Sequence, residues 1–307
     1  MPLVELFRSF GLTVFSSLNK NFSNGNIVVR CVGNMTRRQI LIGLLSLSLG
    51  GSVMNLSSFA QPFSSCLELE LKFKYEREGD SYTQGLLYEY DHDLKRGILY
   101  ESGGRYGRSL LRKFEANTGK ILKEIKIPDN YFAEGLAVVE NHLFMLTWRE
   151  RTCLVYDKES FELIDEFRYS GEGWGITFDG EYLIMSDGSS TIRFLDPKTF
   201  RQVRTVKVFF EDLVGRRQTV NFLNELEFVN GEIWSNIYQQ DYVVRIDPKS
   251  GRVIGKALNF SRMVPDLFKG NLEYVLNGLA FDKQMNNLYV TGKCWPVVYV
   301  FSISTKK

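Results

Sequence analysis

Five residues recur at one position of a repeated motif, and their side chains could together carry out acid–base chemistry. Each is followed by Gly or Glu and then by Leu or Ile, and we call the five the ring residues: Gln84, Glu134, Trp174, Asn224 and Asn277. Glu134 alone among them has a carboxyl group, which takes up and returns protons near neutral pH when apolar walls raise its pKa. The carboxamides can donate and accept hydrogen bonds.

The spacing of the ring residues predicts the fold. Successive positions lie 50, 40, 50 and 53 residues apart. A strand-rich repeat of about 40–50 residues is typical of a blade of a β-propeller. Equivalent positions in the blades surround the central channel, so one carboxylate, three carboxamides and an indole should face a common space. We therefore predict an all-β fold, a five-bladed β-propeller.

Each repeat contains short apolar runs that predict further strands after the ring motif. The predicted second strands are 97–102, 142–148, 182–187, 232–237 and 287–291. The predicted third strands are 109–115, 152–157, 191–196, 242–247 and 297–302. The predicted outer strands are 120–126, 162–167, 202–208 and 252–257.

The fifth repeat has no outer strand of its own. The alternating segment 67–75 is left over to supply it, so we expect the propeller to close by pairing of the N- and C-terminal strands. Such closure removes exposed sheet edges. Segments 209–220 and 260–274 are longer insertions, which we expect to be loops or short helices.

The first sixty residues read as a leader. Residues 35–60 combine Arg37-Arg38, an apolar run over 40–49 and Ser58-Phe59-Ala60, the pattern of a signal peptide with a twin-arginine export signal. The apolar run is too short to span a bilayer. Residues 1–34 read as an upstream extension or part of the leader, and an organelle transit sequence is the alternative. We expect an exported protein, periplasmic or extracellular, or lumenal in a photosynthetic cell, with residues 61–307 as a single catalytic propeller.

Charge, histidine and cysteine content exclude several kinds of site. Without residues 1–60 the chain has 33 basic and 35 acidic residues, so the overall charge of +2 gives no argument for nucleic acid. Only two histidines occur, His92 and His142, both in polar turns, which argues against a three-histidine zinc site and a Ser-His-Asp triad. Cys66, Cys153 and Cys294 follow the leader without C-x-x-C spacing, and one disulfide plus a free thiol remains open.

One basic and several aromatic residues also fall at strand ends. Lys293 follows the second strand of the last repeat, where it would point toward the channel mouth; the alternative is a surface lysine. Aromatic residues at strand ends could line a pocket or belong to the core: Trp148, Trp174, Tyr238 and Trp295. Trp234 lies within an apolar run, and we assign it to the core.

These motifs together resemble the plant and bacterial glutaminyl-peptide cyclotransferases over nearly all of residues 67–303. The resemblance is carried by Tyr-Thr-Gln-Gly-Leu (82–86), Phe-Ala-Glu-Gly-Leu (132–136), Leu-Thr-Trp (146–148), Gly-Trp-Gly-Ile (173–176), Leu-Asn-Glu-Leu-Glu (223–227), Leu-Asn-Gly-Leu-Ala-Phe (276–281) and Val-Thr-Gly-Lys-x-Trp-Pro (290–296). It implies a five-bladed propeller and an acyltransferase that converts N-terminal glutamine to pyroglutamate and releases ammonia.

The resemblance also implies roles for individual residues. The family's essential acid corresponds to Glu134, and its polar substrate-binding residues correspond to Gln84, Asn224 and Lys293. Its aromatic pocket corresponds to Phe132, Trp148 and Trp174. Two positions differ: Tyr82 stands where Phe is usual, and Tyr238 stands where Trp is expected. Both keep a ring, so we expect an altered pocket that still works.

The expected chemistry follows from these roles. Glu134 and Lys293 are the predicted catalytic residues, and Gln84, Asn224 and Asn277 with the aromatic residues Tyr82, Phe132, Trp148, Trp174, Tyr238 and Trp295 are the predicted substrate-binding residues. We expect no required cofactor and no metal ligand among these residues, although the resemblance allows a structural cation such as calcium in the channel. We expect a monomer that acts on peptides or proteins with N-terminal glutamine, with no nucleic acid and no membrane after the leader is removed.

Two other functions are open on the sequence alone, because one fold hosts many functions. The first is a non-catalytic propeller that binds a peptide or small ligand at the same channel mouth. Such a module has no reason to keep Glu134 and Lys293 together beside carboxamides. The second is a metal-dependent lactonase-type propeller, which would need several acidic ring residues where this chain has one.

Overall fold

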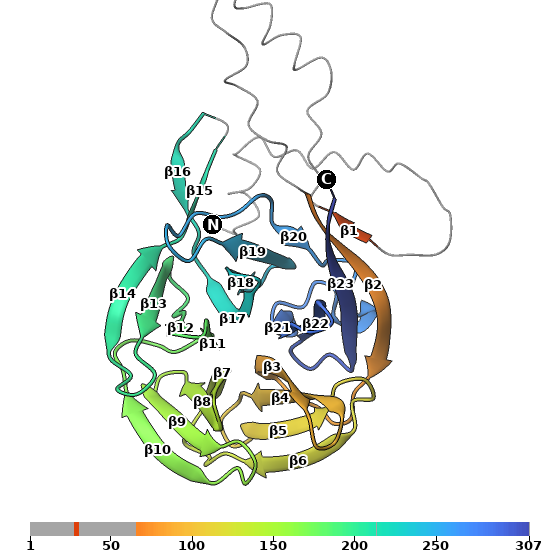
Figure 1. The fold of residues 1–307 in the computed structure, drawn as a ribbon, viewed down its shortest axis with the longest axis vertical. Coiled ribbons are helices and arrows are strands. Elements are labelled where there is room, and N and C mark those ends of the chain that lie inside the picture. Colours follow the sequence, from red (N-terminus) through yellow and green to blue (C-terminus); the bar gives the residue numbers. More distant parts are fainter. Residues whose placement is uncertain (1–27, 31–65, 213, 307) are drawn as a thin grey trace, which may run out of the picture.

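In the computed structural model, which describes residues 28–30, 66–212 and 214–306, five antiparallel sheets surround a central axis (Figure 1). The first blade is β3 (Thr83–Asp91), β4 (Arg96–Gly103), β5 (Leu110–Glu115) and β6 (Ile121–Lys126). The second is β7 (Ala133–Val139), β8 (His142–Thr147), β9 (Thr152–Asp157) and β10 (Leu163–Arg168). The third is β11 (Ile176–Phe178), β12 (Leu183–Met185), β13 (Thr191–Leu195) and β14 (Gln202–Lys207). The predicted five-bladed propeller is confirmed.

The last two blades complete the circle. The fourth is β17 (Leu223–Val229), β18 (Glu232–Ile237), β19 (Tyr242–Ile246) and β20 (Leu258–Asn259). The fifth contains β21 (Leu276–Asp282), β22 (Asn287–Gly292), β23 (Val297–Lys306) and β2 (Cys66–Glu76). β2 pairs antiparallel with β23 from Cys66 opposite Lys306 to Glu76 opposite Val297. The predicted closure by the two chain ends is therefore confirmed.

The innermost strands of the blades, β3, β7, β11, β17 and β21, contact one another around the axis, as Figure 1 shows. Glycine after the ring residue allows this close approach. A Cβ atom on Gly135 would lie 2.6 Å from the backbone nitrogen of Ile176, and one on Gly175 would lie 2.1 Å from the backbone oxygen of Asn224. Any larger residue at these two positions would push neighbouring blades apart.

Apolar side chains fill the space between blades. One cluster joins the fourth and fifth blades and includes Trp234, Leu288 and Phe301, which are almost completely buried. The assignment of Trp234 to the core is confirmed. Each such side chain contributes about 1.5–3 kcal/mol on burial. The outer strands are more exposed, as the burial pattern of β10 illustrates.

One of the two insertions and one outer strand differ from the sequence interpretation. Segment 209–220, expected as loop or short helix, forms the hairpin β15 (Phe209–Glu211) and β16 (Arg217–Thr219). The predicted outer strand 252–257 is wrong: its place is taken by the two-residue β20. Gly251 and Val253 bond to the backbone of Phe209, and Val253 keeps one isolated bridge to Ile246 of β19. Gly255 has a φ of +64°, which breaks an extended strand. The second insertion contains the short 3₁₀ helix η2 (Asp266–Phe268).

A further strand was not predicted. β1 (Val28–Arg30) pairs antiparallel with β2 and extends the closing sheet. The predicted signal peptide, its cleavage site and the rest of the predicted extension lie outside the described residues. Within the described part of the chain, no helix has the length and hydropathy needed to cross a membrane.

Candidate active site

The carboxyl group of Glu134 lies at the start of the inner strand β7 and is almost completely buried, with 4% of the residue exposed. Gln84, at the same place in the neighbouring strand β3, donates from Nε2 to Glu134 Oε1 at 3.0 Å. Burial raises the pKa of the Glu134 carboxyl well above its usual value, while the nearby Lys293 ammonium opposes this rise. The Glu134 carboxyl therefore keeps its proton to a higher pH than an ordinary glutamate does.

The carboxamides of the ring continue from Gln84 across to the fifth blade. Asn277 donates from Nδ2 to the backbone oxygen of Thr83 at 2.9 Å and to Gln84 Oε1 at 3.3 Å. This bond fixes which end of the Gln84 amide faces Glu134, because its oxygen accepts from Asn277 and its nitrogen donates to Glu134. Asn277 thus orients Gln84, a role that the repeat alignment did not distinguish from direct binding.

Trp174 belongs to the third blade, and Asn224 belongs to the fourth. Asn224 is buried, and its backbone oxygen accepts from Ser186 Oγ at 2.6 Å. Trp174 is half-buried, and its backbone oxygen accepts from the nitrogen of Gly135 at 2.7 Å. These bonds connect the start of each inner strand to the adjacent blade, so the ring residues are held on a rigid frame.

Lys293 is not a surface lysine, since only 3% of it is exposed. Its Nζ atom lies 4.7 Å from the centre of the Tyr82 ring and 5.0 Å from the centre of the Tyr238 ring. A cation between aromatic faces is stabilised by the ring quadrupoles. Burial nevertheless lowers the pKa of Lys293 to about 8, and the Glu134 carboxylate opposes this fall. The structure thus places Tyr82 and Tyr238 directly against Lys293, a predicted catalytic residue.

Aromatic side chains form a wall beside the ring residues. Phe132 makes edge contacts with Tyr82, at 6.3 Å between ring centres, and with Trp148, at 5.5 Å. Trp174 makes an edge contact with Tyr238 at 5.5 Å. All five are half-buried, so they cover the buried polar groups while keeping part of their surface open to solvent.

Trp295 does not belong to this wall. It is 1% exposed and belongs to the core cluster between the fourth and fifth blades, with its indole Nε1 donating to the backbone oxygen of Tyr274 at 2.9 Å. A Cβ atom on Gly292 would lie 2.3 Å from the Trp295 ring, so the indole packs under the turn that carries Lys293. Its predicted role as a substrate-binding residue is therefore at odds with its position.

Acidic residues around the wall were missed in the sequence. Glu172 Oε2 accepts from the indole Nε1 atoms of both Trp148, at 2.8 Å, and Trp174, at 3.0 Å. Glu150 accepts from the hydroxyl of Tyr106 at 2.7 Å and from the backbone nitrogen of Phe132 at 3.3 Å. Glu172 therefore fixes two indoles relative to each other. Glu150 likewise connects the side chain of Tyr106 to the backbone of Phe132.

Two further carboxyl groups lie on β17, those of the buried Glu225 and the half-buried Glu227. Glu225 occupies the place where the other four inner strands have glycine, and it accepts from the backbone nitrogen of Leu279 at 3.0 Å. Glu227 accepts from the backbone nitrogen of Phe281 at 2.7 Å. Burial raises the pKa of the Glu225 carboxyl well above its usual value and that of the Glu227 carboxyl to about 8. Both tie the fourth blade to the fifth.

A calcium site needs six to eight oxygen ligands. Glu225 and Glu227 already accept backbone N–H groups, and the described residues contain no group of three or more His, Cys, Asp and Glu side chains placed to hold a metal ion. A structural cation in the channel stays a prediction. A cavity of about 500 Å³ lies between the closing blade and residues 262–269, and none of the ring residues lines it.

The remaining predicted features lie away from the ring. His92 is exposed and His142 is half-buried at the start of β8, in agreement with their placement in polar turns. Cys153 and Cys294 are free thiols. The thiol of Cys153 is buried in the second blade, and Cys294 is half-buried next to Lys293.

Comparison with known proteins gives a consistent result. The model of the family described as glutamine cyclotransferase matches residues 44–303. A glutaminyl-peptide cyclotransferase of Arabidopsis thaliana is 37% identical over 235 residues, which cover 76% of this chain and 70% of that protein. The crystal structure of Myxococcus xanthus glutaminyl cyclase matches with a TM-score of 0.68 and 30% identity, and the match covers 78% of this chain and 97% of the other. The resemblance inferred from the motifs is confirmed.

Proposed function

Since the chain belongs to the glutamine cyclotransferase family, we propose that it converts the N-terminal glutamine of peptides and proteins to pyroglutamate and releases ammonia. The observation that carries this proposal is the buried Glu134 carboxyl, hydrogen-bonded to Gln84, in the same site as the buried Lys293 ammonium. A non-catalytic peptide-binding propeller would not need the Glu134 carboxyl and the Lys293 ammonium buried in one site. Membership of a family of acyltransferases also favours the enzyme.

The reaction is an internal acyl transfer. The α-amine nitrogen of the substrate attacks the carboxamide carbon of its own glutamine side chain, the new N–C bond closes a five-membered lactam, and the C–N bond to the amide nitrogen breaks. The attacking amine must be neutral, and a terminal amine has a pKa of about 7.7–8.0, so it needs limited help. Glu134 accepts the proton of this amine and returns it to the departing nitrogen, which leaves as ammonia.

Negative charge develops on the amide oxygen as the amine attacks. Donors that point at this oxygen before the reaction stabilise the transition state. Gln84 already donates to Glu134 and is fixed by Asn277, so we assign the role of oxygen donor to Lys293 and Asn224. The aromatic wall of Tyr82, Phe132, Trp148, Trp174 and Tyr238 would hold the folded-back glutamine side chain, which supplies proximity.

The test of the activity is release of ammonia from a dipeptide amide that begins with glutamine. We expect stoichiometric ammonia and pyroglutamyl product, and no reaction with the matched peptide that begins with asparagine. Failure of the purified chain to release ammonia at any pH from 5 to 10 would overturn the proposal and favour the binding module. The same assay with EDTA tests the further proposal that no cofactor is required: we expect most of the activity to remain, and loss that zinc restores would contradict it.

We also propose that the protein is exported and begins at Gln61 after removal of residues 35–60 together with any preceding residues. This rests on the charged, apolar and small-residue pattern of that segment. Gln61 is itself an N-terminal glutamine, so we expect the exported protein to carry pyroglutamate, formed by a second molecule. Intact mass and N-terminal sequencing of exported protein would check both points; an unblocked Gln61 would contradict only the modification.

A further inference from the structure

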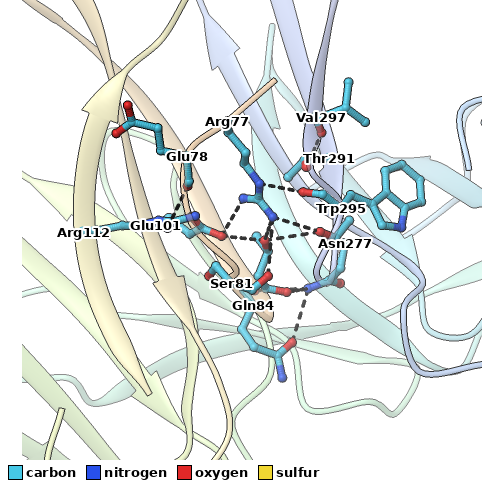
Figure 2. A network of polar contacts seen from close by, with 12 residues as sticks. Arg77, Glu78, Ser81, Gln84, Glu101, Arg112, Asn277, Thr291, Trp295 and Val297 are labelled. Carbon is cyan, nitrogen blue, oxygen red and sulfur yellow. Dashed lines mark hydrogen bonds and ion pairs between the residues drawn. The ribbon is translucent and has the colours of Figure 1, made fainter. Parts of the chain in front are cut away.

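A buried cluster of three charged side chains lies beside the start of β3, which carries Gln84 (Figure 2). Glu101 on β4 accepts from Arg77 Nη1 at 2.8 Å and from Arg112 Nε at 2.6 Å, and the three side chains are at most 1% exposed. Burial acts to raise the pKa of Glu101, but Arg112 and Arg77 outweigh it and hold the pKa at about 2. Glu101 is therefore ionised whenever the protein is folded at neutral pH.

Stability alone does not explain such a cluster. Taking charges out of water is costly, and well-packed apolar residues of similar volume often stabilise a fold equally well or better. The contacts of the cluster with other parts of the chain point to a different role. They reach the two segments that carry Gln84 and Lys293.

The first set of contacts holds the turn after β22. Arg77 donates from Nε to the backbone oxygen of Trp295 at 2.8 Å and from Nη2 to that of Gly292 at 3.3 Å. These two carbonyl groups flank Lys293. Cys294, between them, has a φ of +59°, a left-handed conformation that residues with a side chain adopt rarely. The turn thus needs outside contacts to keep its shape, and Arg77 supplies them.

The second set joins this turn to β3. Thr83, which precedes Gln84, donates from Oγ1 to Glu101 Oε1 at 2.5 Å and lies 3.4 Å from the oxygen of Gly292. Arg77 Nη2 contacts the same hydroxyl at 2.9 Å. Figure 2 shows this continuous path from Arg112 through Glu101 and Arg77 to Gln84 and Asn277. The Glu101 carboxylate therefore contacts both the strand that carries Gln84 and, through Arg77, the turn that carries Lys293.

We propose that Glu101, acting through Arg77 and Thr83, is a positioning residue that holds the Lys293 ammonium between Tyr82 and Tyr238 and in register with Gln84 and Glu134. The catalytic consequence rests on the proposed cyclotransferase function, whereas the geometric consequence does not. Glu101 touches no substrate in this scheme. Its effect is to fix the distance between the groups that do.

The first test compares Glu101→Gln with Glu232→Gln. Glu232 makes two hydrogen bonds with Arg245, each of 2.7 Å. This ion pair lies at the opposite end of β18 from the ring residues, so it serves as the control away from the site. Small displacements of catalytic groups cost up to about 100-fold in rate. We expect Glu101→Gln to lower kcat by about tenfold or more, with KM changed much less, and to shift the alkaline limb of the pH–rate profile. Glu232→Gln should leave kcat and the profile unchanged.

Equal losses of kcat in the two variants, or a folded Glu101→Gln protein with the kcat and pH profile of the wild type, would overturn the proposal. Should Glu101→Gln fail to fold, Thr83→Val carries the test. This change removes the hydroxyl that Glu101 and Arg77 both contact, and it leaves in place the bonds of Arg77 and Arg112 to Glu101. It should lower kcat in the wild-type background but have no further effect in a Lys293→Ala background, because it acts through Lys293. Independent, multiplicative losses would contradict this.

Crystal structures of Thr83→Val and Glu101→Gln separate this proposal from the proposed function. We expect the Lys293 side chain to leave its place between the two tyrosine rings in either variant, whatever the activity. An unmoved Lys293 would refute the positioning role even in an active enzyme. Conversely, wild-type protein that releases no ammonia would refute the function while a displaced Lys293 would still support the positioning role.

Discussion

At the scale of single residues, burial disfavours the charged forms of both predicted catalytic residues, the Glu134 carboxylate and the Lys293 ammonium. Burial raises the pKa of Glu134 and lowers that of Lys293 to about 8, and each charge favours the other. The pair therefore titrates as a coupled unit. A change in the charge of one group therefore changes the pKa of the other.

Glu134→Gln should keep the fold and lower kcat by about 100-fold or more, because it removes the group that carries the proton from the amine to the leaving nitrogen. The isosteric amide can still contact Gln84, so binding should change little. Steady-state ammonia release and thermal unfolding measure the two effects. Turnover close to that of the wild type would remove Glu134 from its catalytic role.

Lys293 should give the enzyme an alkaline limit. The ammonium form is the one that can donate to the developing oxygen charge, so kcat should fall as pH rises through about 8. In Lys293→Met, kcat should be low at every pH and this enzyme-specific fall should be absent. Both proteins are measured with the same substrate, so the titration of the substrate amine cancels.

Thermal unfolding completes this comparison. Burial of a lysine that prefers to lose its proton does not favour folding below its pKa, so Lys293→Met should leave the thermal midpoint unchanged or raise it. The exposed Lys249→Met is the control, with activity unaffected. A strongly lowered midpoint with normal kcat would mean that Lys293 serves packing and not catalysis.

At the scale of strands, β17 carries two acids, Glu225 and Glu227, whose pKa values are raised by burial. The folded-state pKa of Glu227 is about 8, against about 4.3 for an unperturbed glutamate. A raised pKa means that the stabilising contribution of the neutral carboxyl is complete below the unfolded value and is lost as pH rises through the folded value. The contact between β17 and β21 should therefore weaken with rising pH.

Glu227→Gln tests this pH dependence. The variant lacks the titrating group, so the wild type should lose stability relative to it between about pH 4.3 and pH 8, by a few kcal/mol at about 1.4 kcal/mol per pKa unit. Urea unfolding of both proteins at several pH values measures the difference. Glu162→Gln, which changes an exposed carboxyl, is the control. A constant difference across this pH range would show that Glu227 is ionised in the fold.

The strands themselves were largely predictable, for a physical reason. A blade repeats the same alternation of apolar and polar residues, so the ring motif located each inner strand and the turns located the rest. The outer strand 252–257 was mispredicted because Gly255 interrupts it and residues 251–253 also contact Phe209, which is far away in sequence. Likewise, the role of Glu172 depends on two indoles from different blades meeting one carboxylate, which no local pattern encodes.

One further residue near the site, Glu225, was predictable from the sequence. Four of the five ring residues are followed by glycine, whereas Asn224 is followed by Glu225. The sequence repeats alone therefore showed an unusual side chain at this position. Trp295 carried no such signal. Its place at a strand end was compatible with a pocket or with the core, and only the packing against Gly292 decides for the core.

At the scale of the whole molecule, the site belongs to no single blade. Gln84, Glu134, Asn224 and Lys293 come from the first, second, fourth and fifth blades, so their distances depend on closure of the ring. Closure depends in turn on β2, which follows the predicted leader and pairs with the last strand of the chain. An opening of this one sheet would release the constraint on every blade.

Leu69→Ala tests whether the ring behaves as one cooperative unit. Leu69 lies on β2, is completely buried and belongs to the cluster that contains Leu288 and Phe301. Its truncation should lower the free energy of unfolding by about 2–5 kcal/mol, whereas Val203→Ala on the exposed face of β14 should change it by about 0.5 kcal/mol at most.

The decisive measurement for Leu69→Ala is hydrogen exchange of the backbone amides on the five inner strands. If closure constrains the whole ring, the most protected amides of β3, β7, β11, β17 and β21 should lose the same free energy of protection, because they exchange only when the entire ring opens. Loss of protection confined to β21, β22, β23 and β2 would show instead that the closing sheet opens by itself, and that the rest of the ring holds the site without it.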